Sequence, residues 1–156
     1  MNNCHILKVR TRDIGNGPGI RISVWVAGCS HGCDGCHNPE TWKWKQGKEL
    51  TQELINNIIK ACDQSHIEGL TLTGGDPLFV YNRTGVYLLC KAFRDYFGNN
   101  KTIWLWTGYN LEDIRSLPII DLLDVIVDGK YIKELKDVSL PYSGSTNQRV
   151  IKLKEI

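Results

Sequence analysis

The sequence has no long hydrophobic run. No apolar stretch in its 156 residues approaches the roughly 20 residues that are needed to cross a bilayer. The N-terminus, MNNCHILKVR, lacks the apolar segment and the small-residue cleavage site of a secretory signal. We therefore expect a cytoplasmic protein that does not enter a membrane. In that reducing compartment, clustered cysteines hold metal or do chemistry more often than they form disulfides.

An excess of charge of one sign is also missing. The formal net charge is +2, which gives no electrostatic reason to expect nucleic acid or a membrane surface as a partner. Repeats, low-complexity tracts and linker-like segments are absent as well. Residues 1–156 are therefore expected to form a single domain.

Short apolar runs alternate with segments that have helical spacing. Strands are predicted at residues 22–26, 70–73, 102–106 and 125–127, and less clearly at 6–9 and 149–153. Helices are predicted at 54–62 with Thr51 as the cap, at 86–97 ending at Gly98, and in a short segment capped by Asn110 and limited by Pro118. This alternation predicts an α/β fold with a mostly parallel sheet.

An unusual loop follows each of the four main predicted strands: the cysteine loop, then GGDP, TGY and DGKY. Because the C-terminal ends of parallel strands lie along one edge, these loops should converge on one site. A complete eight-stranded barrel needs about 250 residues, so the chain is too short for one. We expect a partial, laterally open (β/α) barrel of mostly parallel strands, whose open flank suits another protein's loop.

Three cysteines, Cys29, Cys33 and Cys36, have the spacing C-x-x-x-C-x-x-C. Thiolates are soft ligands that select iron–sulfur clusters or zinc. A four-iron cluster normally takes four cysteines, so three would leave one iron with an open position that a substrate can occupy.

A structural zinc site is the alternative, with His31 or His37 as the fourth ligand. Such sites usually have a second pair of ligands, which this chain lacks. On spacing alone, the open cluster and the zinc site are about equally favoured. Cys62 and Cys90 lie on apolar helix stripes, where a buried thiol is the ordinary expectation.

Two of the other loops carry candidate binding groups. Gly74, Gly75 and Asp76 form a tight turn where a ligand can approach the backbone, and Asp76 adds an acceptor for an amino group. Asp128 and Lys130 place opposite charges after another strand. Taken alone, the first would more often be a connector and the second a surface turn.

The motifs taken together resemble those of the radical S-adenosylmethionine superfamily. Within it, they are most similar to the glycyl-radical activases of anaerobic ribonucleoside-triphosphate reductase. The segments that carry the likeness occur in the same order between Gly17 and Arg149: GPGIR, CHNPETW, TGGDPL, WTGY, VDGKY and GSTNQR.

The resemblance implies that Cys29, Cys33 and Cys36 hold a 4Fe–4S cluster, whose open iron chelates the methionine part of S-adenosylmethionine. It also implies that Gly74, Gly75 and Asp76 line the methionine amino group. The remaining implied contacts are those of Gly35, Cys36 and His37 beside the adenine, and of Asp128 and Lys130 near the cofactor's carboxylate. Gly35 stands where the superfamily often has an aromatic or apolar residue, so a backbone contact is expected there.

The implied activity is reductive cleavage of S-adenosylmethionine, whose 5′-deoxyadenosyl radical generates a glycyl radical on the reductase large subunit. A flavodoxin-type electron donor is implied as well. Two alternatives stay open: an activase of another glycyl-radical enzyme such as a formate-lyase, and a zinc-stabilised binding module. The segment from Tyr142 to Arg149 is either a solvated loop or part of the reductase interface.

Overall fold

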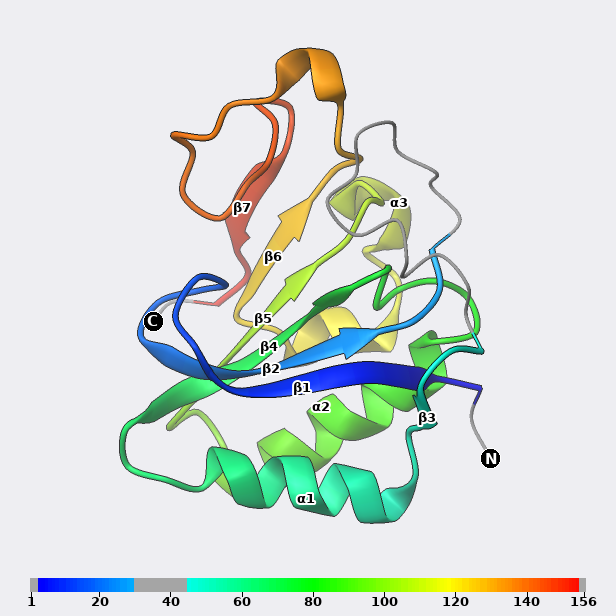
Figure 1. Cartoon of the computed structure of the whole chain (residues 1–156), viewed down its shortest axis with the longest axis vertical. Helices are drawn as coiled ribbons and strands as arrows, with labels where there is room; N and C mark the ends of the chain where they lie inside the picture. The colour runs from blue at the N-terminus through cyan, green and yellow to red at the C-terminus, as the bar shows by residue number, and fades with distance from the viewer. Residues whose placement is uncertain (1–2, 30–44, 155–156) are drawn as a thin grey trace.

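The computed structural model describes residues 3–29 and 45–154, and within them seven strands form one open sheet (Figure 1). The strand order is β3-β1-β2-β4-β5-β6-β7. The three neighbouring pairs from β2 to β6 are parallel, whereas the outer pairs are antiparallel. The strands are β1 (His5–Asp13), β2 (Ile20–Val26), β3 (Lys48–Glu49), β4 (Ile67–Gly74), β5 (Thr102–Trp106), β6 (Val125–Asp128) and β7 (Arg149–Lys152).

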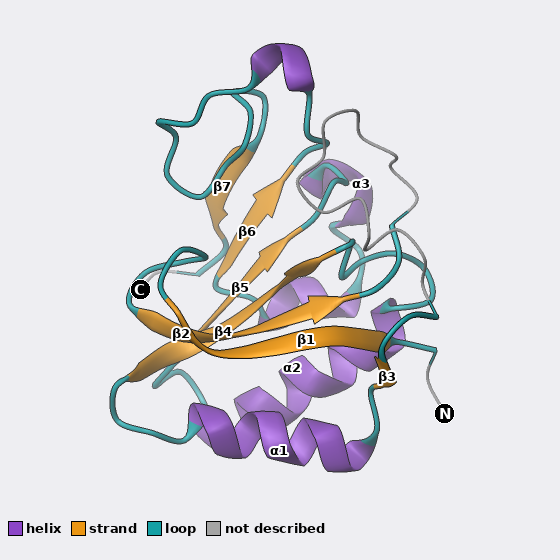
Figure 2. Ribbon diagram, viewed as in Figure 1, coloured by secondary structure: helices purple, strands orange, loops and turns teal. Residues whose placement is uncertain are grey.

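Helices α1 and α2 cover one face of this sheet (Figure 2). The helical elements are α1 (Gln52–Cys62), α2 (Arg83–Phe97), α3 (Leu111–Ile114), and the 3₁₀ turns η2 (Pro118–Leu122) and η3 (Lys133–Leu135). Between sheet and helices lies the main hydrophobic core, which includes Ile22, Leu72 and Ile103 from the strands and Ile58 and Phe93 from the helices. Within residues 3–29 and 45–154, no helix has the length and apolar character that a membrane crossing requires.

The opposite face of the sheet carries aromatic and polar side chains. Because side chains alternate along a strand, Ile103 and Leu105 of β5 point to the helices while Trp104 and Trp106 point away from them. Trp104 is only 7% exposed, as expected for a core residue, and packs with two valines of β6 in a second, smaller cluster. The candidate site lies on this second face.

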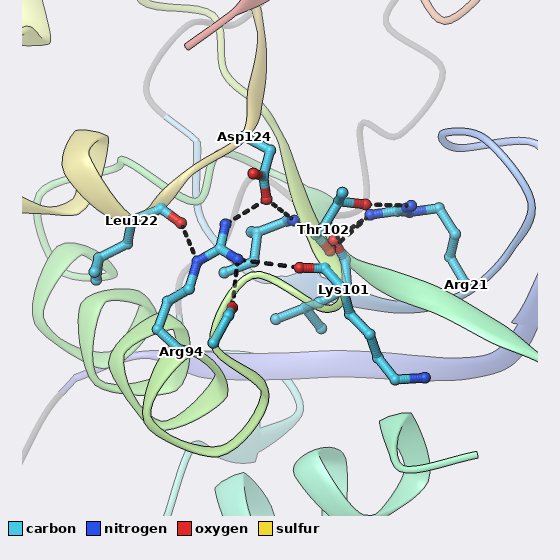
Figure 3. A network of polar contacts seen from close by, with 9 residues as sticks. Arg21, Arg94, Lys101, Thr102, Leu122 and Asp124 are labelled. Carbon is cyan, nitrogen blue, oxygen red and sulfur yellow. Dashed lines mark hydrogen bonds and ion pairs between the residues drawn. The ribbon is translucent and has the colours of Figure 1, made fainter. Parts of the chain in front are cut away.

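A buried polar network holds the first residues of β5 (Figure 3). Arg94 of α2 forms an ion pair with Asp124 and donates to three backbone carbonyls, and Asp124 accepts the Ile103 N–H at 2.7 Å. From the other side, Arg21 of β2 donates to both oxygens of Thr102 at 3.0 Å. These contacts fix the end of β5 that lies opposite to the candidate site.

All six predicted strands and the two long helices are present. Thr51 caps α1 as predicted, since its Oγ1 accepts the Leu54 N–H at 3.1 Å, and α2 ends at Gly98, whose φ is 58°. Asn110 occupies the position before the short helix α3, as predicted, but its side chain makes no capping hydrogen bond. The Leu111 N–H donates to Asp128 instead. The fold is therefore α/β with a mostly parallel, open mixed sheet.

Candidate functional site

A cavity of about 460 Å³ lies where the parallel strands end. This volume is within the range of pockets that bind small molecules. Each of the four loops that were predicted to converge contributes to its wall. The contributing residues are Cys29 after β2, Gly74, Gly75 and Asp76 after β4, Thr107 and Gly108 after β5, and Gly129 after β6.

The first residues of the cysteine loop are bonded to the turn that follows β4. Three successive carbonyl groups of Val26, Ala27 and Gly28 accept from Gly75 N at 2.9 Å, Asn82 Nδ2 at 2.8 Å and Asp76 N at 2.7 Å. Two of these three donors are backbone N–H groups, and the third is the side-chain amide of Asn82. The sequence analysis did not identify Asn82. The chain entering Cys29 and the turn beside it are held as one unit.

Two glycines are required for this close approach. Gly28 has φ 99° and Gly74 has φ 111°, a region that side chains other than glycine rarely adopt. A Cβ on Gly74 would lie 2.5 Å from the Val26 carbonyl oxygen, so no side chain fits there. The GGDP turn is thus built to bring two strand ends together and leave backbone groups beside the cavity.

The Asp76 carboxylate joins this turn to the loop after β5. It is 1% exposed and accepts from Leu78 N at 2.9 Å, Thr107 Oγ1 at 2.8 Å and Gly108 N at 2.9 Å. Thr107 Oγ1 also lies 3.0 Å from the second carboxylate oxygen, so both oxygens of Asp76 take part in these contacts. The structure therefore places Asp76 at the cavity and also gives it a structural task.

Asp128 and Lys130 differ from that pattern. Asp128 is fully buried, accepts from Arg149 and from Leu111 N at 2.8 Å, and does not belong to the residues that line the cavity. Lys130 is exposed and does not line it either, whereas Gly129 between them does. The structure thus does not bring these two charges to the cavity with Gly74–Asp76. The carboxylates of Asp128 and Glu112, which form ion pairs with Arg149, raise the pKa of its guanidinium.

The segment that ends in GSTNQR forms one wall of the cavity. Gln148 donates to Gly129 O at 2.9 Å and accepts from Gly144 N at 2.8 Å. Tyr142 lies on the same wall with a left-handed φ of 66°, and its carbonyl accepts from Trp106 Nε1 at 2.7 Å. These contacts hold the segment against the sheet, so the segment belongs to the wall of the cavity. Its role at a reductase interface stays a prediction.

Another part of the wall comes from the connection between β1 and β2. Gly15 and Asn16 line the cavity there, and Asp13 holds them by accepting from Gly15 N at 2.9 Å and Asn16 Nδ2 at 2.8 Å. Burial alone would raise the pKa of Asp13, but hydrogen bonds from Asn16, Ser23 and Gly15 outweigh it and lower this pKa. The turn is thus held by an ionised carboxylate.

Arg21 supports the same wall from below. Its guanidinium is fully buried and donates to Thr71 Oγ1 at 2.9 Å, and Thr71 in turn donates to Asn16 O at 2.6 Å. The arginine of the NGPGIR motif therefore does not line the cavity but fixes a residue that does.

Of the predicted cluster ligands, Cys29 is half-buried and lines the cavity. Cys33 and Cys36 lie outside the described residues, as do the predicted adenine neighbours Gly35 and His37. Within the described part of the chain, no three potential ligand side chains come together. The thiol of Cys29 beside the glycine turn nevertheless suits an iron–sulfur cluster, because thiolates are the ligands that such clusters select.

Cys62 and Cys90 are confirmed as core residues. Both are fully buried in the main hydrophobic cluster. Burial raises the pKa of each thiol to about 12. Both thiols therefore belong to the apolar interior, and neither lines the cavity.

The chain matches the family model of the 4Fe–4S single cluster domain over residues 15–151. It is 44% identical over 138 residues to the anaerobic ribonucleoside-triphosphate reductase-activating protein of Enterobacteria phage T4, covering 88% of this chain and 87% of the relative. The protein of that name from Escherichia coli K12 is 40% identical over 146 residues, covering 91% and 94%. The chain belongs to this family of activating proteins. The one from Vibrio cholerae is 40% identical over 140 residues, covering 87% and 90%.

Family membership confirms the resemblance that the sequence motifs indicated. An iron–sulfur activating enzyme is supported over the zinc-stabilised binding module, because the matching domain is a 4Fe–4S domain. The matched range includes the cysteine motif, the GGDP turn and the GSTNQR segment, so it takes in every wall of the cavity described above.

Proposed function

We propose that this protein uses a 4Fe–4S cluster and S-adenosylmethionine to generate a glycyl radical on the large subunit of an anaerobic ribonucleoside-triphosphate reductase. The observation that carries the proposal is the shared cavity of Cys29 and the Gly74–Asp76 turn, whose backbones are bonded to each other. The names of the relatives support the choice of partner. The alternative, an activase of a formate-lyase, would act on a different partner, and the names of these relatives do not support that partner.

In this proposal, Cys29, Cys33 and Cys36 hold the cluster. Backbone groups of Gly74 and Gly75, with the Asp76 carboxylate, bind the amino end of the methionine moiety. For Asp128 we propose an indirect role, since its bonds to Arg149 and α3 position Gly129 at the cavity wall.

Three further contacts complete the proposed site. Gly35 and His37, on either side of Cys36, are assigned to the adenine. Lys130 is assigned to the neighbourhood of the cofactor's carboxylate. These assignments rest on the family resemblance.

When bound, the cluster and S-adenosylmethionine supply a one-electron cleavage that yields a 5′-deoxyadenosyl radical. The protein's contribution is to position the reacting groups and to keep water and other C–H bonds away from them. The aromatic rings of Trp25, Trp106, Tyr131 and Tyr142 serve that purpose, since they make much of the cavity wall apolar. We also propose that the open sheet is a partial, laterally open barrel of the radical S-adenosylmethionine type, which the reductase closes from its open flank. A flavodoxin-type donor in the cytoplasm would supply the electron.

The test is anaerobic reconstitution with iron and sulfide, followed by spectra with and without S-adenosylmethionine. We expect a cluster whose electron paramagnetic resonance signal changes when the cofactor is added. Adding the reductase should then produce a glycyl radical signal, and adding a formate-lyase should not. A protein that holds zinc alone, or a cluster that ignores the cofactor, would overturn the proposal.

A control for unspecific loss of folding is available in the same chain. Cys29→Ala should abolish the cluster, whereas Cys62→Ala should retain its iron and sulfide because that thiol is a core group. Loss of the cluster in a folded Cys62→Ala protein would contradict the ligand assignment.

A further inference from the structure

Asn82 occupies a position that usually serves another purpose. It directly precedes α2, where asparagine commonly caps a helix with its side chain. Here the side chain makes no capping hydrogen bond. Its two amide N–H groups point to Ala27 O at 2.8 Å and Asp76 O at 3.0 Å. The amide therefore bridges Ala27 and Asp76, which are 49 positions apart in the sequence.

The bridge is rigid. Asn82 is fully buried, its backbone N–H donates to Phe79 O at 2.7 Å, and its carbonyl accepts from Val86 N at 2.9 Å. Its Oδ1 is buried without a donor among the residues that the structure describes. Turning the amide over would set that oxygen against two carbonyl oxygens, so the donating orientation is fixed by its acceptors.

The two bridged segments are the two sides of the candidate site. Ala27 lies two residues before Cys29, and Asp76 ends the turn beside the cavity. The other bonds between these segments, from Gly75 N and Asp76 N, belong to the backbone and do not depend on a side chain. Among the described residues, Asn82 thus adds a side-chain link between the residues that precede Cys29 and the glycine turn.

We propose that Asn82 is a positioning residue that fixes the cluster-bearing loop relative to the turn that binds the amino end of S-adenosylmethionine. It acts through Ala27 and Asp76 and does not itself line the cavity. The inference rests on the proposed function for the identity of the two ligands. The placement of one segment on the other can be measured without either ligand.

The first experiment uses the full chain without cluster and follows amide hydrogen exchange. Asn82→Asp keeps the shape but replaces the donating amide by a carboxylate, and Asn82→Ser keeps one donor. We expect the Gly75 and Asp76 amides to exchange at least about tenfold faster in Asn82→Asp, and less so in Asn82→Ser. The amides in the middle of α2 should stay as protected as in the wild type.

Two results would overturn the proposal. One is unchanged protection of the Gly75 and Asp76 amides in a folded Asn82→Asp or Asn82→Ser protein. The other is an equal loss of protection along all of α2, because that would make Asn82 an ordinary helix-end residue. Asn110→Asp is the matched control, since Asn110 also precedes a helix without capping it and is exposed.

The second experiment measures S-adenosylmethionine affinity of the reconstituted proteins from the change in their cluster spectrum. Outer residues that orient a ligand typically change metal affinity or activity by about 10–100-fold, so we expect affinity to fall about tenfold in Asn82→Asp at unchanged iron content. Equal affinity in wild type and variant would contradict the proposal. If the wild type holds no cofactor-responsive cluster, the proposed function fails, while faster exchange at Gly75 and Asp76 would still support the bridge.

Discussion

Replacing Arg21 by lysine should strongly destabilise the protein, even though charge is retained. Arg21 belongs to β2, and its fully buried guanidinium reaches across β4 to β5. It donates to Thr71 Oγ1 at 2.9 Å and to Leu70 O at 3.0 Å. It also donates to Thr102 O and Oγ1 at 3.0 Å each (Figure 3). Gly69 makes this path possible, because a Cβ there would lie 2.7 Å from Arg21 Nη2.

The size of the loss in the free energy of unfolding depends on how many buried acceptors a lysine leaves without a hydrogen-bond donor. An ammonium group is a compact point charge without the planar fork of a guanidinium, so it cannot satisfy acceptors on β4 and β5 together. If two buried acceptors lose their donors at about 1–3 kcal/mol each, the free energy of unfolding falls by about 2–6 kcal/mol. That is a large share of the about 5–15 kcal/mol that holds a typical domain folded. Burial lowers the pKa of Arg21 to about 10, although the nearby carboxylates of Asp124 and Glu68 act against this shift.

Urea denaturation of the cluster-free protein, followed by tryptophan fluorescence, measures this loss. The midpoint should shift without a change in the denaturant slope. Arg12→Lys is the control, since Arg12 is exposed on β1 and such surface changes usually stay within about 0.5 kcal/mol. An Arg21→Lys protein as stable as the Arg12→Lys control would refute the reasoning that the fork geometry is what the sheet requires.

Three further outcomes are expected. Cys29→Ala should lose iron on anaerobic reconstitution while Cys90→Ala keeps it, as measured by metal analysis; the reverse result would contradict the assignment of Cys29 as a ligand. Burial raises the pKa of Cys62 and Cys90 from 9.0 to about 12, so unfolded thiols ionise first as the pH rises. The free energy of unfolding should therefore fall above pH 9 by about 1.4 kcal/mol per pH unit for each thiol, and Cys90→Ala should show a shallower fall in denaturation experiments. Trp106→Phe removes the donor to Tyr142 O and should increase amide exchange from Tyr142 to Gly144, whereas unchanged exchange would show that other contacts hold this wall.

The elements of the fold were predictable because each has a local signature. The run TIWLW predicts a strand from its β-branched and aromatic residues, and the capping bond of Thr51 depends on a residue only three positions away. The open sheet also followed from chain length. The contacts at the start of α3 are non-local: Asn110 precedes the helix without a capping bond, and Asp128 reaches there from the end of β6 and accepts the Leu111 N–H.

The loops of the site were predictable in the same way, but their internal organisation was not. The rule that C-terminal ends of parallel strands share an edge brought Cys29, the GGDP turn and Gly129 to one cavity. It says nothing about the contacts of Asn82 or Gln148, which join residues 55 and 19 positions apart in the sequence. Asn82 lies outside the quoted motifs, and although Gln148 lies within GSTNQR, the motif does not reveal which groups its side chain contacts.

Asp76 and Asp128 show how far sequence reasoning can go. Each is an acidic residue at the end of a parallel strand beside a glycine, so the sequence gives both the same weight. Their bonding partners separate them: Asp76 accepts from Thr107 and Gly108 and lines the cavity, whereas Asp128 accepts from Arg149 and lies beneath it. Asp76→Asn would replace one carboxylate oxygen by an NH2 group, whose N–H donors would face groups that now donate to Asp76. The substitution should therefore both loosen the loop after β5 and weaken cofactor binding. Asp128→Asn should weaken the hold on Arg149 and affect the cofactor only through Gly129. Comparing S-adenosylmethionine affinity in the two variants, at matched stability in denaturation, distinguishes a residue of the cavity from one that supports it; an equal loss of affinity would show that the two carboxylates act alike.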